Sequence, residues 1–376
     1  MKKVLYVATV LSHICQFHLP YLKMFKEQGY EVHVAARDNL AEKNGLQLQY
    51  ADQHFEIPFQ RSPFSPKNIT SYKQLKKLID KEQYNLIICN TPVGGIVTRM
   101  AAKKARKKGT KVVYIAHGFH FYQGASKKNW LIYYPIEKHF AKKCDRLITI
   151  NEEDYLLAKK KFKVKVERIH GVGVSAERYH SIAYEEKVEL RRLMGYEQDD
   201  FLLLIVGELL PNKNQIQAIK AIEKIVGSDS FVHLLIAGNG KERVNLENYV
   251  REHNLENNVH FLGYCTCLER YQSIVDLGIS CSIREGLGLN VIEAMMSGNA
   301  FIATKNRGHN ELIINNENGF LVDVDDVEDL ANKIISIIND GNLRQRLAMN
   351  AQRLIKPYTL EETKNELSNI LGMILT

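Results

Sequence analysis

The chain has 376 residues, of which 45% are hydrophobic and 25% charged, the ordinary balance of a soluble globular protein with room for two domains. Its first apolar run, Val4 to Leu11, is broken by Ser12 and His13 and is too short for a membrane-spanning helix. The run also lacks the small-residue cleavage site of a secretory signal, so we expect a buried strand in a cytoplasmic protein. The six cysteines are scattered without the paired spacing of a zinc site, which indicates reduced, structural thiols.

The net charge of +8 conceals an asymmetry between the two halves of the chain. Residues 1–180 contain 32 Lys and Arg against 15 Asp and Glu, a net charge of +17, whereas residues 181–376 contain 19 against 28, a net charge of −9. A basic half suits nucleic acid, an anionic membrane surface or a substrate that carries a diphosphate. Charge alone does not choose among these partners.

Strands and helices are expected to alternate through the first half of the chain. Apolar runs predict the strands, and apolar residues at helical spacing between them predict the helices. The alternation is typical of a doubly wound parallel α/β sheet. We expect strands at residues 4–10, 31–36, 86–89, 111–116 and 146–150, and helices at 18–28, 95–108, 130–143 and in a segment that runs through 163.

The residues that follow each strand are informative, because such sheets bind ligands outside the carboxyl ends of their strands. No Gly-x-Gly-x-x-Gly follows the first strand, which argues against a dinucleotide site. Polar and aromatic side chains instead occupy three loops, although a histidine in a loop is more often structural than catalytic. The candidate ligand residues of these loops are His13, His18, Thr91, His117, His120 and Tyr122.

A dense basic run at residues 103–111 is followed by aromatic residues that include Trp130, Tyr133 and Tyr134. Such runs are usually solvated helix faces. The mixture of basic and aromatic side chains also suits a membrane interface that carries a lipid-linked substrate.

The second half repeats the alternating pattern after a polar, glycine-bearing hinge at about residues 170–200. Asp323 and Asp325 superficially resemble a metal-binding pair. They precede an apolar helix, however, so with Asp326 they are interpreted as N-cap and first-turn acids and no metal site is expected. We expect strands at residues 201–207, 231–237, 259–262, 277–281, 300–304 and 319–322, and a last helix from beyond 357 to 373.

The most informative stretch lies at residues 284–296, where a glycine-bearing loop with Glu285 runs into a helix with Glu293. Gly286 and Gly288 allow a ligand to approach the backbone, and a helix that starts at Leu289 presents its positive end to a phosphate. The two glutamates can accept hydrogen bonds from sugar hydroxyls on either side of that phosphate. The alternative is that both glutamates are ordinary helix-end and solvated charges.

These residues resemble the Glu-(seven residues)-Glu motif of glycosyltransferase family 4, whose members are retaining enzymes of the GT-B fold. The resemblance extends over nearly the whole chain and implies two Rossmann-like α/β domains that face a cleft. It places an acceptor-side domain at residues 1–180, with a C-terminal helix at 357–376 that packs back on it, and a nucleotide-sugar-binding domain at 181–356.

The resemblance also implies roles for individual residues. Catalytic roles fall to His117 and Glu285, which hold the sugar, and to Lys213, which neutralises the departing diphosphate. Glu208 stands where the family usually has arginine, so it is expected to orient Lys213 or to bind the sugar. The Gly-Gly that many relatives place after the first strand is missing. The residues expected to bind the nucleotide-sugar are Gly207, Glu208, Gly238, Gly263, Tyr264, Gly286, Leu287, Gly288, Leu289 and Glu293.

Family membership implies transfer of a hexose or N-acetylhexosamine from a UDP-sugar, with retention and without a metal or other cofactor. Relatives with similar loops act in exopolysaccharide or capsule assembly, so the expected acceptor is a saccharide on a polyprenyl diphosphate at the anionic cytoplasmic face of the membrane. A UDP-N-acetylglucosamine 2-epimerase of the same fold is one alternative. A non-enzymatic nucleic-acid-binding protein is another, but no nucleic-acid-binding motif accompanies the basic residues. The sequence specifies neither the donor sugar, the linkage nor the oligomeric state.

Overall fold

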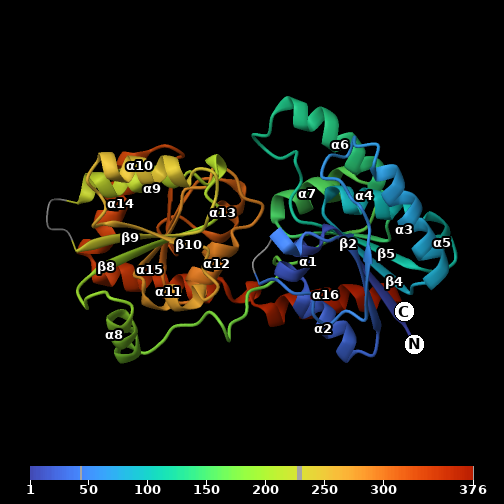
Figure 1. Ribbon diagram of the computed structural model, residues 1–376, viewed down its shortest axis with the longest axis horizontal. Coiled ribbons are helices and arrows are strands. Elements are labelled where there is room, and N and C mark those ends of the chain that lie inside the picture. The colour runs from blue at the N-terminus through green and yellow to red at the C-terminus, as the bar shows by residue number, and fades with distance from the viewer. Residues whose placement is uncertain (43–44, 227–230, 376) are drawn as a thin grey trace. The chain divides into compact units, whose positions relative to one another are not determined.

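The structure is a computed structural model that describes residues 1–42, 45–226 and 231–375, and Figure 1 labels many of its elements. The chain divides into two compact units, Met1–Gly173 with Leu360–Thr376, and Val174–Thr359. The first unit ends slightly before the boundary expected at residue 180, and the last helix, α16 (Leu360–Leu375), belongs to it. Within the described ranges, no helix is both long and apolar enough to cross a membrane.

The first unit contains a seven-stranded parallel sheet with the order β3-β2-β1-β4-β5-β6-β7. The five expected strands are present, and two short ones, β3 and β7, were not expected. Both are at least partly exposed, so they lack the continuous apolar runs that identify buried strands. The strands are β1 (Lys3–Val10), β2 (Glu31–Arg37), β3 (Gln53–Glu56), β4 (Leu86–Asn90), β5 (Lys111–Ala116), β6 (Arg146–Thr149) and β7 (Val166–Arg168).

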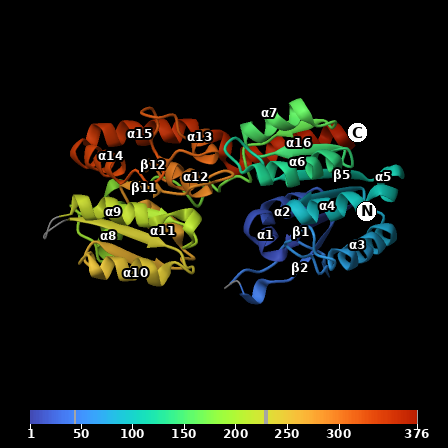
Figure 2. The ribbon, with the colours of Figure 1, turned by 90° about the horizontal axis from the view of Figure 1, so that it is seen from above.

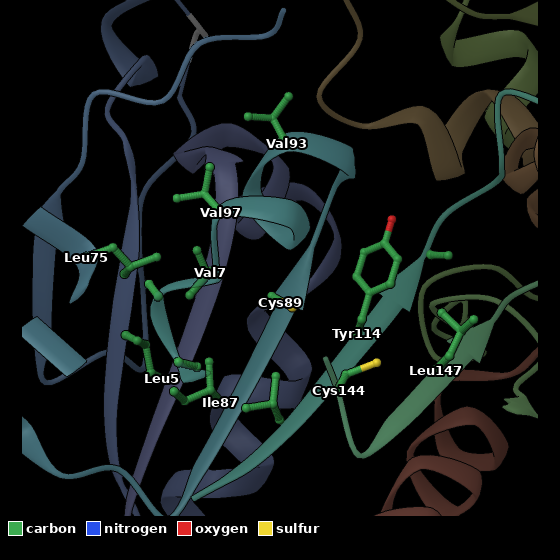
Figure 3. Packing of buried hydrophobic residues seen from close by; sticks show 14 of the residues in the cluster. Leu5, Val7, Leu75, Ile87, Cys89, Val93, Val97, Tyr114, Cys144 and Leu147 are labelled. Atoms are coloured by element: carbon green, nitrogen blue, oxygen red, sulfur yellow. The ribbon is translucent and has the colours of Figure 1, made fainter. Parts of the chain in front are cut away.

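Helices cover both faces of this sheet. Leu5 and Val7 of β1 point to one face, where they join a core with side chains of α3, α4, α6 and α7, and part of this core is shown in Figure 3. Tyr6 points to the other face and contacts Phe25 of α2, and the Tyr21 hydroxyl of α2 donates to Thr363 of α16. The helices are α1 (Leu11–Phe17), α2 (Leu19–Glu27), α3 (Asn68–Glu82), α4 (Pro92–Ala101), α5 (Lys103–Lys107), α6 (Lys127–Ala141) and α7 (Glu152–Lys161), with a 3-10 turn, η1 (Leu40–Glu42).

Two expectations for this unit are wrong in detail. The segment after β1 is not a loop, because α1 begins directly at Leu11, and His18 is both the C-cap of α1 and the N-cap of α2. His13 therefore lies on a helix. The single helix expected at residues 95–108 is two helices, α4 and α5, which meet at Ala102.

The second unit contains a six-stranded parallel sheet with the order β10-β9-β8-β11-β12-β13. All six strands were expected, whereas α8 (Tyr184–Leu193) lies in the segment expected to be hinge. The strands are β8 (Phe201–Val206), β9 (Val232–Ala237), β10 (Val259–Gly263), β11 (Leu277–Ser280), β12 (Ala300–Thr304) and β13 (Phe320–Val322).

Helices cover this second sheet as well, and Figure 2 shows the elements from a second direction. The Asp326 side chain accepts from the Asp329 amide and caps the helix that follows, which confirms the N-cap interpretation. The helices are α9 (Gln215–Ile225), α10 (Arg243–Glu252), α11 (Leu268–Ile274), α12 (Leu289–Met296), α13 (Arg307–Leu312), α14 (Val327–Asn339) and α15 (Gly341–Leu354), with the 3-10 turns η2 (Pro211–Lys213) and η3 (Lys356–Tyr358).

Candidate functional site

In each sheet the strand order changes direction at one point, called the topological switch point. The segments that follow the strands at this point carry expected site residues. The reversal lies between β1 and β4 in the first unit and between β8 and β11 in the second. Open α/β sheets bind ligands outside the carboxyl ends of the strands at such points. In the second unit this position holds the segment after β8, which ends in Lys213, and the loop after β11, which contains Glu285.

Lys213 and Glu285, expected to act separately on phosphate and sugar, form an ion pair. Lys213 Nζ donates to Glu285 Oε1 at 2.6 Å, and the two side chains are 25% and 15% exposed. The segments that carry them are joined by Asn212, whose carbonyl accepts from the Ile283 amide at 2.8 Å and whose Nδ2 donates to the Arg284 carbonyl at 3.0 Å. The fold therefore places one cation and one carboxylate side by side at the switch point.

Glu208 is exposed and is not the carboxylate that pairs with Lys213. Its two expected roles, to orient Lys213 or to bind the sugar, stay predictions. Gly238 has a packing role, because a Cβ built there would lie 2.0 Å from the Gly207 carbonyl oxygen. The loops after β8 and β9 are thus in backbone contact, which only glycine permits.

The helix expected at residues 289–296 is confirmed, since α12 spans Leu289–Met296 and Gly288 is its N-cap. Leu287 is buried beside it. A Cβ at Gly288 would lie 2.8 Å from a methyl carbon of Val291, so a larger residue would disturb the first turn. The positive end of α12 thus follows directly on the loop that carries Glu285.

Glu293 of α12 is half-buried, and burial raises the pKa of its carboxyl to about 7. Charge attraction by Arg178 and a hydrogen bond from the Tyr179 hydroxyl oppose this rise in pKa. Arg178 is itself held by Glu269 at 2.7 Å. Sequence reasoning missed Arg178 and Tyr179 because they lie in a segment interpreted as hinge and far from Glu293 in the chain.

The segment after β12 packs against the loop that carries Glu285. A Cβ at Gly308 would lie 2.8 Å from the Glu285 Cβ, and Arg307 Nε donates to the Glu285 carbonyl at 3.3 Å. His309 is fully buried beside Gly288, and its Nδ1 lies 2.6 Å from the Thr304 carbonyl oxygen, to which it donates. Its Nε2 has no hydrogen-bond partner among the described residues. His309 is not among the residues expected to bind the nucleotide-sugar.

The turn formed by Gly263 and Tyr264, which is expected to bind the nucleotide-sugar, lies at the end of β10. Gly263 has a φ of +70°, which favours glycine, and its carbonyl accepts from the Gly238 amide at 2.7 Å. The Tyr264 side chain is 52% exposed. Binding of the nucleotide-sugar by Gly263 and Tyr264 stays a prediction.

In the first unit, three of the expected ligand residues are brought together. His13 of α1, His18 at the α1–α2 junction and His117 after β5 are in ring contact, with centroids 4.8 to 5.2 Å apart. Burial lowers the pKa of His13 to about 4 and holds the pKa values of His18 and His117 well below their usual range. All three rings are therefore neutral at pH 7.

Thr91, His120 and His13 line one cavity of about 260 Å³ in the first unit. The Thr91 hydroxyl is already engaged, because it contacts the Thr9 hydroxyl at 2.7 Å and accepts from the Thr9 amide at 3.0 Å. His120 is stacked on Tyr133, with ring centroids 4.6 Å apart. Tyr122 is not among the residues that line this cavity, and its carbonyl accepts from the Trp130 indole nitrogen at 3.2 Å.

A buried ion pair beside this cavity was not anticipated from the sequence. Arg99 of α4 donates to Glu137 of α6 at 2.9 Å and lies 3.9 Å from the centroid of the Tyr114 ring. Gly95 allows this arrangement, because a Cβ there would lie 2.5 Å from the same ring. Both residues lie on expected helices, and no sequence signal distinguished them from ordinary surface charges.

Comparison with known proteins shows the family. Residues 187–354 match the family of glycosyl transferases group 1, and residues 3–151 match the glycosyl transferase 4-like family. A Bacillus subtilis (strain 168) protein named as a glycosyltransferase, EpsD, is 41% identical over 371 residues, which are 98% of this chain and 96% of that protein. An Escherichia coli protein, named as a UDP-Gal:alpha-D-GlcNAc-diphosphoundecaprenol alpha-1,3-galactosyltransferase, is 25% identical over 88% of this chain and 86% of its own.

Among solved structures, Anabaena HepE in complex with UDP and glucose matches with a TM-score of 0.79 and 20% identity, over 99% of this chain and 100% of that chain. This likeness supports the fold expected from the sequence, two Rossmann-like α/β units of the GT-B class. The chain belongs to glycosyltransferase family 4 and is a GT-B glycosyltransferase.

Proposed function

We propose that the protein transfers a hexose or N-acetylhexosamine from a UDP-sugar to a saccharide on a polyprenyl diphosphate, in the assembly of an exopolysaccharide or capsule. The name of the E. coli relative specifies a UDP-sugar donor and a diphosphoundecaprenol acceptor. A Campylobacter jejuni relative, 30% identical over 48% of this chain, is named for a PP-undecaprenol acceptor as well. HepE has been solved with UDP. Because the chain belongs to a glycosyltransferase family, no observation supports the epimerase alternative or the non-enzymatic alternative.

The observation that carries the proposal is the position of Lys213, Glu285 and the start of α12 at the switch point of the second sheet. In this proposal the diphosphate binds at the N-terminus of α12, and Lys213 exchanges Glu285 for a phosphate oxygen. Glu285 is then released to accept hydrogen bonds from the sugar. A cation and a helix N-terminus aimed at the same oxygens stabilise the negative charge that grows on the leaving diphosphate.

Glu293 is assigned to the ribose hydroxyls and His117 to the transferred sugar. A neutral His117 accepts or donates a hydrogen bond and carries no charge, which suits an uncharged sugar hydroxyl. The proposed reaction needs no side-chain nucleophile. The acceptor hydroxyl attacks the face that the diphosphate leaves, and a diphosphate oxygen takes the proton, so the anomeric configuration is retained and no metal is required.

We also propose peripheral contact of the first unit with the anionic cytoplasmic face of the membrane. Leu131 of α6 is 80% exposed, and α6 begins with Lys127 and Lys128, both exposed. An exposed apolar side chain among lysines suits the interface of an anionic bilayer, where a lipid-linked acceptor resides. Co-sedimentation with phosphatidylglycerol vesicles tests this contact: Leu131→Asp is expected to lower binding, and equal binding would contradict the assignment.

The experiment that tests the proposed function is a panel of UDP-sugars, incubated with the protein and a polyprenyl-diphosphate-linked sugar, with and without EDTA. Mass spectrometry of the lipid is expected to show the addition of one sugar from one donor, to the same extent in EDTA. Isomerisation of a donor without any acceptor would support the epimerase alternative and overturn the proposal. Loss of transfer in EDTA would overturn metal independence alone.

A further inference from the structure

The cluster formed by His13, His18 and His117, here called the histidine cluster, has a geometry that transfer chemistry does not require. One ring nitrogen from each residue lies within 4.8 Å of the other two. The His13 and His18 Nε2 atoms are 3.4 Å apart. Two imidazoles whose nitrogens approach this closely either share a proton or both direct their lone pairs at a third atom.

The spacing of two of the three ring nitrogens matches the requirements of a transition metal ion. Zinc holds imidazole nitrogens at about 2.0–2.1 Å in a tetrahedral arrangement, which separates the ligand nitrogens by roughly 3.3–3.5 Å. The His13–His18 pair already has this separation, at 3.4 Å. The nitrogen separations that involve His117 are at most 4.8 Å, so this ring must approach the other two by up to about 1.4 Å, a shift that side-chain rotation can supply.

Neighbouring groups hold the cluster in place. The backbone of His18 is fixed at the α1–α2 junction, where its amide donates to the Ile14 carbonyl at 2.8 Å and its carbonyl accepts from the Leu22 amide at 3.0 Å. His117 Nε2 lies 3.1 Å from Asn90 Oδ1, an acceptor that orients the ring. Metal-binding histidines usually donate their second ring nitrogen to such an oxygen. His13 also lines the cavity of the first unit, which provides a path for an ion to enter.

We propose that His13, His18 and His117 form a binding site for a transition metal ion of the zinc type, and that the bound ion inhibits the enzyme. Three histidines leave the fourth tetrahedral position to water or to an anionic oxygen. The inhibition rests on the proposed function, because an ion that occupies a nitrogen of His117 withdraws that ring from the sugar. The ion is an inhibitor in this proposal and takes no part in the transfer step.

Binding is tested first, with metal-free full-length protein and Co²⁺ as a visible probe. Tetrahedral Co²⁺ absorbs strongly in the visible range, and Zn²⁺ is expected to displace it with a stoichiometry of one ion per chain. His13→Ala and His18→Gln are expected to weaken binding at least about tenfold, because each removes one of three ligands. His13 is only half-buried, so the His13 variant keeps the test valid where the His18 variant is unstable.

Two control variants exclude other sites. His139 is exposed on α6, and His139→Ala is expected to bind Co²⁺ like the wild type. In the second unit, His233 and His260 have ring nitrogens 3.1 Å apart, so His260→Ala shows whether that pair contributes to the signal. Wild-type protein without a tetrahedral Co²⁺ spectrum, or His13→Ala that binds as tightly as the wild type, would overturn the site.

Activity is tested second, in the transfer reaction with the donor that the UDP-sugar panel identifies. Zn²⁺ is expected to inhibit the wild type and His139→Ala equally, and EDTA is expected to restore both. Ion binding without inhibition would overturn the inhibitory role and leave the site intact. Absence of transfer from every donor would instead overturn the proposed function, while the Co²⁺ measurement would still decide the site.

Discussion

Substitution of Lys213 is expected to weaken UDP binding, whereas substitution of Glu285 is not. The two side chains form an ion pair at 2.6 Å, with 25% and 15% of their surfaces exposed. An exposed pair contributes about 0–1 kcal/mol, and this more enclosed pair lies near the upper end of that range. A diphosphate that binds Lys213 must first replace Glu285, so in the free enzyme the carboxylate competes with the ligand.

The magnitudes follow from this competition. Lys213→Met removes a charge-assisted hydrogen bond to phosphate, worth about 1.5–3 kcal/mol, and is expected to weaken UDP binding about ten- to a hundredfold. Glu285→Gln removes the competitor, so UDP affinity is expected to stay unchanged or to rise up to about fivefold. Its transfer rate is expected to fall about a hundred- to a thousandfold, because a preorganised contact to the sugar is lost.

Isothermal titration with UDP and a transfer assay with the preferred donor measure the two effects separately. Lys220→Met, on the exposed face of α9, is the matched control for loss of a lysine and is expected to change neither quantity. The reasoning is refuted if Glu285→Gln weakens UDP binding as much as Lys213→Met does, or if Glu285→Gln transfers sugar at the wild-type rate.

Three further predictions concern stability. The folded-state pKa of Glu293 is raised from 4.5 to about 7, so the contribution of this carboxyl to stability is present below about pH 4.5 and is lost as pH rises through about 7. Glu293→Gln should therefore be more stable than the wild type at about pH 8, by about 1–3 kcal/mol. A stability difference between the two proteins that does not change from about pH 5 to about pH 8 would contradict this prediction. Glu137→Gln leaves Arg99 buried without its counter-charge and should lower the free energy of unfolding, measured in urea, by about 3–5 kcal/mol. The double variant Arg99→Met, Glu137→Leu should recover most of this loss. A loss below about 1 kcal/mol in Glu137→Gln would contradict a stabilising role of the ion pair. Gly238→Ala should destabilise the protein by about 1–3 kcal/mol, because the added Cβ would lie 2.0 Å from the Gly207 carbonyl oxygen. Gly341→Ala is the control, since a Cβ at Gly341 would lie in open space. Equal melting temperatures for the two variants would contradict the packing role of Gly238.

Most strands of the two sheets were predictable because they are largely buried and appear as continuous apolar runs. The helix α12 was predictable for a related reason, since glycines precede it and apolar residues recur along it. The partly exposed strands β3 and β7 and the helix α1 lack such signals, and α1 has no side-chain cap at Val10. Short elements of this kind are defined by tertiary packing more than by local sequence.

Individual site residues were predictable from the sequence, but the contacts between them were not. Both Lys213 and Glu285 were identified, yet their ion pair joins residues 72 positions apart and follows from the sheet order. His13, His18 and His117 were named as separate candidates, and only the fold brings them together. Arg178 and Tyr179, which interact with Glu293, come from a distant segment of the chain. Contacts of this kind produce no periodic pattern in the sequence.

The measurement that tests the central claim most directly is the structure of the lipid product, by mass spectrometry and NMR, from a reaction with an α-linked UDP-sugar in EDTA. The account predicts a polyprenyl-diphosphate-linked saccharide that is longer by one sugar, joined through an α linkage. A β linkage would contradict the proposed same-face mechanism, and release of free sugar with an unchanged lipid from every donor would contradict the proposed acceptor.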